Sequence, residues 1–305
     1  MEEFELARAG AAALAVAASL DLPADDAVVL FNSNKVALRL EPCDVLARVT
    51  RAGHGGEARL ELDRALSLAG AGCPVGAALP GVAPLVHEEA GFVVTLWTYH
   101  DTAACPVTAD AYAAALGQLH AGMRTADLTS PRFTDRIAEA QQVVADPALS
   151  PDLAQEDRAL LTSRLAALRQ TILEFDAPEQ LLHGEPHPGN VLGTRQGPVF
   201  IDFETLCRGP VEFDLAHAPE EVCEHYPGIN RELLDLCRQL VLAMVASWRW
   251  DVGDEFPNRQ YWRRALLHAL RERLPWPSPD LPMPTVVYQA QDKAVKAGSR
   301  ASASR

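Results

Sequence analysis

The pattern of apolar and polar positions changes near residue 98. Before this point, short apolar runs rich in β-branched residues alternate with turns, which is typical of an antiparallel sheet. The turn Phe-Asn-Ser-Asn-Lys between the first two runs has the composition of a hairpin loop. Helical periodicity predicts an Ala-rich helix over 3–20 and a helix over 56–70. The expected strands are residues 27–32, 35–40, 44–50, 84–88 and 92–97.

Beyond residue 98 the apolar residues recur mainly with the helical period. Helices are expected over 108–123, 135–146, 156–175, 231–250 and 259–274. Two strand-like pieces interrupt them at 190–194 and 198–203. The small polar residues at the end of the sequence predict a disordered tail. We therefore expect an α+β protein with an antiparallel β-rich domain carrying one inserted helix, a mainly helical domain and a tail, at residues 1–98, 99–290 and 291–305.

Composition and charge exclude several classes of protein. The 305 residues, 48% hydrophobic and 22% charged, are typical of a globular chain long enough for two domains. The net charge of −14 argues against a nucleic-acid partner and against a basic membrane anchor. The six cysteines show no C-x-x-C spacing, and the acidic start does not have the character of a signal peptide. No apolar run approaches the roughly 20 residues of a membrane span. We expect a reduced, cytoplasmic protein; its oligomeric state is not predicted.

The candidate chemistry lies between Leu181 and Glu204. Pro and Gly residues after Glu185 predict an ordered loop, and a short hairpin then leads to Asp202. This path brings Glu185, Asn190 and Asp202 around one pocket. Phosphoryl transfer needs a group that orients the attacking hydroxyl and oxygen ligands that hold magnesium on the phosphates. We assign the first role to Glu185 and magnesium binding to Asn190 and Asp202.

The order and spacing of these residues are similar to those of kinases. His-Gly-Glu, four residues and Asn stand where kinases have H-R-D-x-x-x-x-N, and Ile-Asp-Phe-Glu stands where they have D-F-G. With Gly-Pro-Val-Glu-Phe-Asp-Leu-Ala-His further on, residues 27–250 resemble the aminoglycoside phosphotransferase family. The resemblance implies a bilobal, protein-kinase-like fold and a phosphotransferase that uses ATP (or GTP) and Mg²⁺ to phosphorylate a hydroxyl of a small molecule. Glu185 departs from the family pattern, which has Asp.

The resemblance also implies a nucleotide site in the first lobe. Arg48 stands where the family has the cation that contacts the nucleotide phosphates. Its helix partner is expected to be Glu61, with Glu57 as the alternative. In place of a Gly-rich loop, the first hairpin turn would cover the phosphates with the donors Ser33 and Asn34. Backbone groups of a hinge between the lobes would meet the adenine edge at Leu96, Trp97 and Thr98.

The acceptor stays open between several classes. An aminoglycoside or similar aminated compound is the family default. Residues 202–224 carry seven acidic side chains and one basic one, which favours a cationic acceptor. The candidates to bind it are Asp214, Glu220 and Glu221, although Asp214 could instead brace the catalytic loop. Choline-, homoserine- and sugar-kinase-like enzymes are alternatives. A catalytically inactive nucleotide-binding regulator is another, favoured by Glu185 and opposed by the two intact metal ligands.

Other motifs are weaker. Residues 53–58 fit a dinucleotide fingerprint, but no parallel βαβ unit surrounds them. There is no P-loop and no G-x-S-x-G segment. His183 and His187 are separated by a proline and do not form a helical zinc motif, so His183 is expected to order the loop. His120 is expected in the core or at a helix cap.

Overall fold

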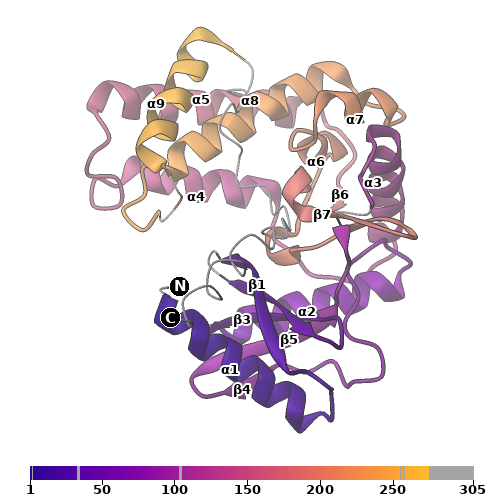
Figure 1. The fold of residues 1–305 in the computed structure, drawn as a ribbon. Helices are drawn as coiled ribbons and strands as arrows, with labels where there is room; N and C mark the ends of the chain where they lie inside the picture. Colours follow the sequence, from indigo (N-terminus) through magenta and orange to yellow (C-terminus); the bar gives the residue numbers. More distant parts are fainter. Residues whose placement is uncertain (2, 33–34, 103–104, 255, 257, 275–305) are drawn as a thin grey trace, which may run out of the picture.

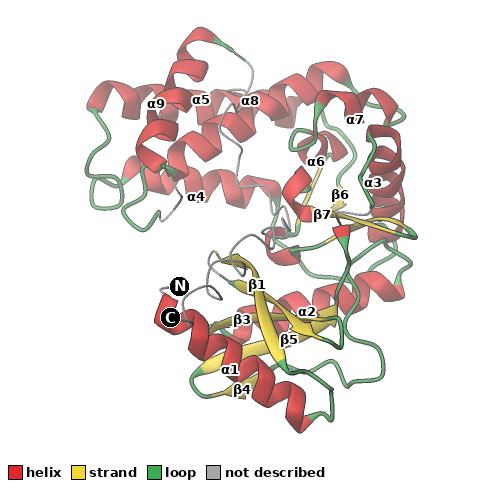
Figure 2. Ribbon diagram, in the orientation of Figure 1, coloured by secondary structure: helices red, strands yellow, loops and turns green. Residues whose placement is uncertain are grey.

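The computed structural model describes residues 1, 3–32, 35–102, 105–254, 256 and 258–274 (Figure 1). Two predicted features lie outside the described residues: the turn donors Ser33 and Asn34, and the tail over 291–305. The described chain forms one lobe built on a sheet and one built mainly of helices (Figure 2). The predicted α+β fold class is therefore confirmed.

The sheet of the first lobe is antiparallel, and its described strands have the order β1-β2-β3-β5-β4. They are β1 (Asp26–Asn32), β2 (Val36–Glu41), β3 (Val45–Arg51), β4 (His87–Glu89) and β5 (Phe92–Thr98). Four of the predicted ranges agree with these bounds within one residue. The predicted range 84–88 begins too early, because the chain pairs with β5 only from His87 to Glu89.

The alternation of side chains gives this sheet two buried faces. On one face, Val36 and its neighbours pack against α1 (Glu3–Ser19), whose alanines allow a close approach (Figure 1). On the other face, Leu46 and Trp97 share a core with α2 (Gly55–Gly70) and with residues of the second lobe. The sheet therefore turns one face toward α1 and the other toward the helical lobe.

The second lobe contains the helices α3 (Ala109–Met123), α4 (Phe133–Ala145), α5 (Gln155–Glu174), α6 (Val211–Leu215), α7 (Glu220–His225), α8 (Arg231–Trp248) and α9 (Arg259–Glu272). Helices α4, α5, α8 and α9 pack around one apolar core. The sequence did not predict α6 and α7, because each is shorter than two helical turns and cannot show a period. None of the helices in the described part of the chain has the length and apolarity to cross a membrane.

Residues 180–209 form two short two-stranded sheets. The hairpin of β7 (Val191–Thr194) and β8 (Gly197–Phe200) was predicted. The pairing of β6 (Gln180–Leu182) with β9 (Cys207–Gly209) was not, since three residues are too few to show alternation. The linker after α2 is hydrogen-bonded to this hairpin, because the N–H of Gly76 donates to the carbonyl of Phe200 at 2.8 Å. This bond holds the end of β8 against the first lobe.

Candidate active site

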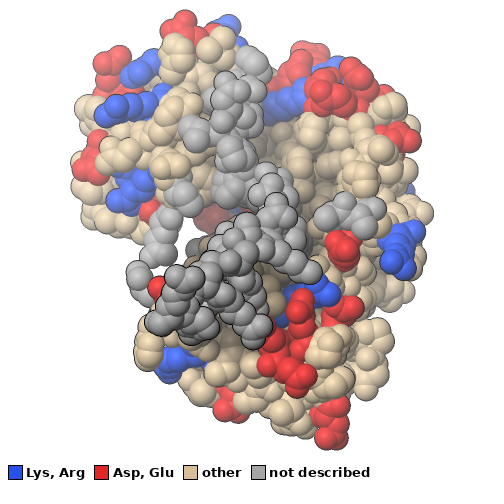
Figure 3. Space-filling view, in the orientation of Figure 1, with Lys and Arg blue, Asp and Glu red and all other residues tan. Residues whose placement is uncertain are grey.

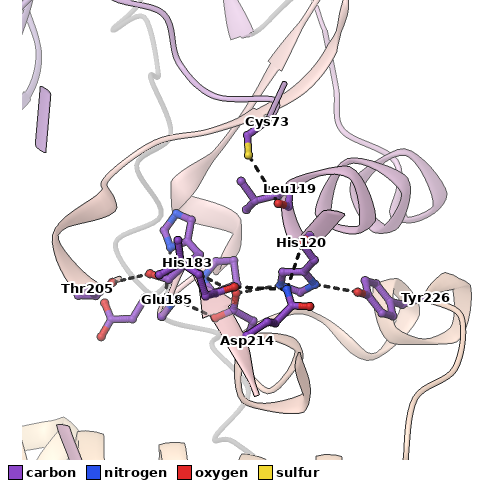
Figure 4. Close-up of polar contacts among 12 residues, drawn as sticks. Cys73, Leu119, His120, His183, Glu185, Thr205, Asp214 and Tyr226 are labelled. Atoms are coloured by element: carbon purple, nitrogen blue, oxygen red, sulfur yellow. Dashed lines mark hydrogen bonds and ion pairs between the residues drawn. The ribbon is translucent and has the colours of Figure 1, made fainter. Parts of the chain in front are cut away.

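The loop after β6 is held by the buried carboxylate of Asp214 in α6 (Figure 4). This carboxylate accepts the backbone N–H groups of His183 and Gly184, both at 2.8 Å, and lies 3.0 Å from Nε2 of His120. Burial would raise the pKa of Asp214, but the hydrogen bond from His120 and its other contacts hold the pKa below its usual value. Because the side chain is 0% exposed, Asp214 braces the loop and does not face an acceptor. Of the two roles considered for it, the structure supports bracing.

The two histidines weighed above as zinc ligands or loop residues serve the same loop. His183 is buried, and its Nε2 lies 3.0 Å from the carbonyl oxygen of Ile201. Burial lowers its pKa, so the ring is neutral near pH 7. Nδ1 of His187 accepts the N–H of Gly189 at 3.0 Å. Across the described residues, no group of three or more His, Cys, Asp or Glu side chains is arranged to hold a metal ion.

Gly184 is the residue at which this loop approaches its neighbours most closely. Its φ is +91°, and a Cβ added there would lie 2.0 Å from the carbonyl oxygen of Thr205. The oxygen belongs to the backbone and cannot rotate away. Only glycine fits this position.

We expect Gly184→Ala to lower the free energy of unfolding by at least about 2 kcal/mol, because backbone strain of about 1–3 kcal/mol is joined by a steric overlap. Gly197→Ala is the matched control: its φ is +114°, but a Cβ there meets no atom within 4 Å. In the control, the free energy of unfolding should fall only by the cost of the backbone strain. Urea unfolding of both variants measures the difference. Equal losses would contradict the close approach of the loop to Thr205.

The hairpin after the loop brings Asn190 and Asp202 together. Nδ2 of Asn190 donates to the carbonyl oxygen of Glu185 at 3.0 Å, and the carbonyl of Asn190 accepts the N–H of Ile201 at 3.0 Å. Asp202 follows directly in a left-handed conformation, with φ 67° and ψ 71°. Both side chains line one pocket between the lobes.

This pair of side chains fits a divalent metal ion of the magnesium type. Oδ1 of Asp202 is buried and has no hydrogen-bond partner among the described residues. The amide nitrogen of Asn190 is bonded to Glu185, which leaves the amide oxygen for another partner. Carboxylate and amide oxygens are ligands that Mg²⁺ accepts together with water and phosphate oxygens. An uncompensated buried carboxylate oxygen is the feature that a cation would satisfy.

The first lobe contributes a cluster of charges to the same pocket. Arg48 of β3 forms an ion pair with Glu61 of α2, which is 3% exposed. Glu61, the predicted partner of Arg48, is therefore the residue in contact with it. The alternative, Glu57, is exposed, and its Oε2 lies 3.1 Å from Nδ1 of His54. Lys35, just before β2, also reaches Glu61, at 2.8 Å.

Lys35 is a pocket residue that the sequence analysis missed. It pairs with Glu204 of the second lobe as well as with Glu61, so it joins the two lobes across the pocket. Burial, with a further contribution from Arg48, lowers its pKa to about 8. A signal was present: Lys35 ends the turn that was expected to cover the phosphates. A lysine there places a second cation beside Arg48.

The predicted hinge has a different set of partners from those expected. Trp97 and Thr98 line the pocket, but the carbonyl of Leu96 accepts the N–H of Leu79 at 3.2 Å. The N–H of Thr98 donates to the carbonyl of Ala77 at 2.9 Å. These two backbone groups are therefore already bonded to the linker. The Oγ1 of Thr98 is buried, has no partner within the described chain, and belongs to a pocket-lining residue.

Glu185 is held by an arginine from another helix. Arg136 of α4 forms an ion pair with its carboxylate and donates to the carbonyl of Gly184 at 2.9 Å. Burial would raise the pKa of Glu185, but the Arg136 guanidinium outweighs it and lowers the pKa to about 2. The side chain keeps 28% of its surface exposed, so a ligand can reach it. Arg136 could not be predicted as this partner, because it lies 49 positions from Glu185 in the sequence, on a helix with no motif.

Part of the acidic run over 202–224 is engaged within the protein. Glu220 is about half exposed and forms ion pairs with Arg231 and Arg238. Oε1 of Glu212 accepts the N–H of Asn230 at 3.0 Å, and Glu204 pairs with Lys35. On the face drawn in Figure 3, acidic and basic side chains of the described residues are interspersed.

A sheet that bears an ion-paired arginine, joined to a helical lobe whose loop presents a carboxylate, an asparagine and a second carboxylate, defines the class of kinase-like phosphotransferases. The model of the phosphotransferase enzyme family matches residues 32–249, and the chain belongs to this family. It is a phosphotransferase with a kinase-like fold. No curated protein matches the chain.

Solved structures of low sequence identity share the fold. A choline/ethanolamine kinase family protein from Mesorhizobium loti is 14% identical, with a TM-score of 0.62 over 81% of this chain and 87% of that one. The amicoumacin kinase hAmiN, solved with AMP-PNP, Ca²⁺ and Ami, is 11% identical, with a TM-score of 0.64 over 90% and 97%. The GDP and kanamycin complex of APH(2")-IIia is 16% identical, with a TM-score of 0.61 over 83% and 94%. These likenesses support the kinase-like form of the predicted fold.

Proposed function

We propose that the protein transfers the terminal phosphoryl group of ATP or GTP, with Mg²⁺, to a hydroxyl group of a small molecule. The observation that carries this proposal is the pocket in which Asn190 and Asp202 meet the Arg48–Glu61 pair. Both lobes are needed to form it. Residues 1–98 would bind the nucleotide, and residues 99–290 would supply catalysis and the acceptor site. The nucleotides named for the similar structures, AMP-PNP and GDP, lend support.

Arg48, Lys35, Glu61, Asn190 and Asp202 of the pocket each have a role in this proposal. Arg48 and Lys35 would contact the phosphates, and Glu61 holds both cations in place. Asn190 and Asp202 would hold magnesium, which supplies positive charge where phosphate charge develops. The Trp97 and Thr98 side of the pocket would receive the base.

Glu185 would orient the acceptor hydroxyl. With a pKa of about 2, its carboxylate is ionised at neutral pH and can accept a hydrogen bond from the hydroxyl. So low a pKa makes it a weak base. This is compatible with phosphoryl transfer, in which positioning of the nucleophile matters more than early proton removal.

An ADP-release screen tests the proposal. Purified protein is given ATP or GTP with Mg²⁺ and aminoglycosides, other antibiotics, choline, amino acids and sugars in turn. We expect ADP or GDP release that depends on one class of acceptor and stops with EDTA. Nucleotide binding without release in the presence of any acceptor would favour the catalytically inactive regulator instead.

An aminated acceptor is the more specific candidate. The kanamycin named for a similar structure supports it, whereas the acidic run adds little, because several of its side chains are paired within the protein. The charged neighbours of Glu185 do not add to this support, because the basic groups Arg136 and Arg249 act on its carboxylate. Glu220 and Glu221, which the sequence indicated for a cationic acceptor, lie on α7, where Glu220 is already paired with Arg231 and Arg238.

We expect the double substitution Glu220→Gln, Glu221→Gln to change the acceptor KM by less than about threefold. The charge of Glu220 is already compensated by Arg231 and Arg238, and exposed ion pairs contribute little. Steady-state kinetics at low and high salt measures this. A rise in KM of tenfold or more, with kcat unchanged and a strong salt dependence, would show that α7 binds a cationic acceptor.

The cellular compartment is part of the same proposal. All six cysteines are free thiols. Four of them are buried, and Cys43 and Cys105 are partly exposed. Free thiols are the usual state in a reducing compartment, which supports a cytoplasmic location.

A further inference from the structure

The guanidinium of Arg136 contacts two successive residues of the catalytic loop. Its Nη1 donates to the carbonyl oxygen of Gly184 at 2.9 Å, and its Nη2 donates to Oε1 of Glu185. The arginine is 8% exposed, and its Cζ lies 5.3 Å from the ring centroid of Trp248 in α8. One planar cation is therefore fixed by a ring on one side and by two acceptors at its edge.

We propose that Arg136 is a positioning residue that adapts the catalytic loop to a glutamate, by holding the Glu185 carboxylate at the place where a hydroxyl acceptor is received. This inference rests on the proposed function. Glu carries one more methylene than Asp, so its carboxylate can extend about 1.5 Å further from the backbone. A site of this kind tolerates errors of about 0.5 Å. The extra length has to be taken up by a contact, and the structure provides one.

The contact is rigid at both ends. Phe133, Ile137 and Ala140 anchor α4 in the apolar core, so the helix that carries Arg136 is fixed. The carbonyl of Gly184 is equally fixed, because its own N–H is bonded to Asp214. Arg136 therefore sets the distance between the loop backbone and the carboxylate of the next residue.

The geometry leaves part of Glu185 available to a ligand. Arg136 contacts Oε1, no hydrogen bond to Oε2 is formed within the described part of the chain, and the side chain is 28% exposed. One oxygen can thus be held while the other accepts a hydroxyl. The backbone carbonyl oxygen of Glu185 accepts a hydrogen bond from Nδ2 of Asn190 at 3.0 Å, so Glu185 is joined to a proposed metal-binding residue.

A kinetic cycle tests the proposal on the full-length protein. Arg136→Met keeps the length of the side chain and removes its charge and donors. We expect kcat to fall about 10²-fold, the loss that a displacement of about 1 Å can cause. Nucleotide affinity should stay within about twofold, because Arg136 is not among the residues that line the nucleotide pocket. Arg132→Met is the matched control: Arg132 precedes α4, is about half exposed, and pairs with Glu179 at the surface.

The decisive variant combines Arg136→Met with Glu185→Gln. If Arg136 acts through Glu185, the double variant should lose about as much kcat as either single variant, that is about 10²-fold. Independent effects would multiply to about 10⁴-fold and would overturn the proposal, as would an unchanged kcat in Arg136→Met. If Arg136→Met does not fold, Arg136→Lys replaces it. Lysine keeps the charge but cannot hold two acceptors in one plane, and we expect a loss of about tenfold in kcat without a change in nucleotide affinity. Full activity of Arg136→Lys would also overturn the proposal.

Hydrogen exchange separates this proposal from the proposed function. We expect amides of residues 183–190 to exchange faster in the Arg136 variant than in the Arg132 control, whether or not the wild type transfers phosphate. Faster exchange with an inactive wild type would retain the positioning contact and reject the proposed function. An active wild type with unchanged exchange and unchanged kcat in the Arg136 variant would retain the function and reject the positioning role.

Discussion

Asp202→Ala is expected to reduce phosphoryl transfer to less than about one thousandth of the wild-type rate, because loss of a metal ligand removes several kcal/mol of transition-state stabilisation and each 1.36 kcal/mol is about tenfold. The fold should remain intact. Oδ1 of Asp202 is buried without a hydrogen-bond partner in the described chain, so removal of the carboxylate relieves a desolvation cost.

Two measurements check this expectation together. Acceptor-dependent ADP release gives the rate, and thermal unfolding with and without Mg²⁺ and ATP gives the state of the site. The wild type should gain stability when both ligands are added, whereas Asp202→Ala should gain little. Asp63→Ala is the control, since Asp63 forms an exposed ion pair with Arg59 on α2. Near-normal transfer by Asp202→Ala would remove Asp202 from the site.

Glu185→Gln is expected to lower kcat by at least about 10²-fold, the lower range for a group that works on a proton in the transition state. Glutamine keeps the length of the side chain but loses the charge that balances Arg136 and that would orient the hydroxyl. Affinity for the nucleotide should be nearly unchanged. Binding titrations with ATP and steady-state kinetics with the acceptor separate these two effects.

Glu185→Asp provides a second test of the role of Glu185. Aspartate is the usual residue of the family, yet we expect no gain in activity here. A shorter side chain would draw the carboxylate back from Arg136, whose position is fixed by Gly184 and Trp248. A several-fold gain in kcat for Glu185→Asp, or full activity of Glu185→Gln, would show that Glu185 does not orient the acceptor.

The elements that sequence analysis located best are those with a repeating pattern. Apolar runs rich in β-branched residues extend over the six to seven residues of β1, β2, β3 and β5, and the bounds agree closely. The longer helices, whose apolar residues recur with the helical period, were also predicted with bounds close to those of the structure. Segments of three to six residues, such as β6, β9, α6 and α7, have no room for a period, and contacts made elsewhere in the chain determine them.

In the site, too, residues with a local sequence motif could be predicted, whereas contacts from distant parts of the chain could not. Of the three residues predicted around one pocket, Asn190 and Asp202 line it, because a hairpin connects them. Glu185 is not among the lining residues, and its backbone carbonyl is hydrogen-bonded to Asn190. The partner of Glu185 could not be located, because Arg136 arrives from a helix that carries no local signal. Charge in a stretch of sequence was also a poor guide to what a ligand meets. Glu220 lies in an acidic run, but two arginines nearby in the fold neutralise it.

The most direct test of phosphoryl transfer is to follow the label from ATP radiolabelled in its terminal phosphate into the acceptor identified by the screen. We predict that the wild type moves the label onto a hydroxyl of that molecule and that Asp202→Ala, purified and folded in the same way, does not. Label released only as free phosphate, or transferred equally by the wild type and by Asp202→Ala, would contradict the account.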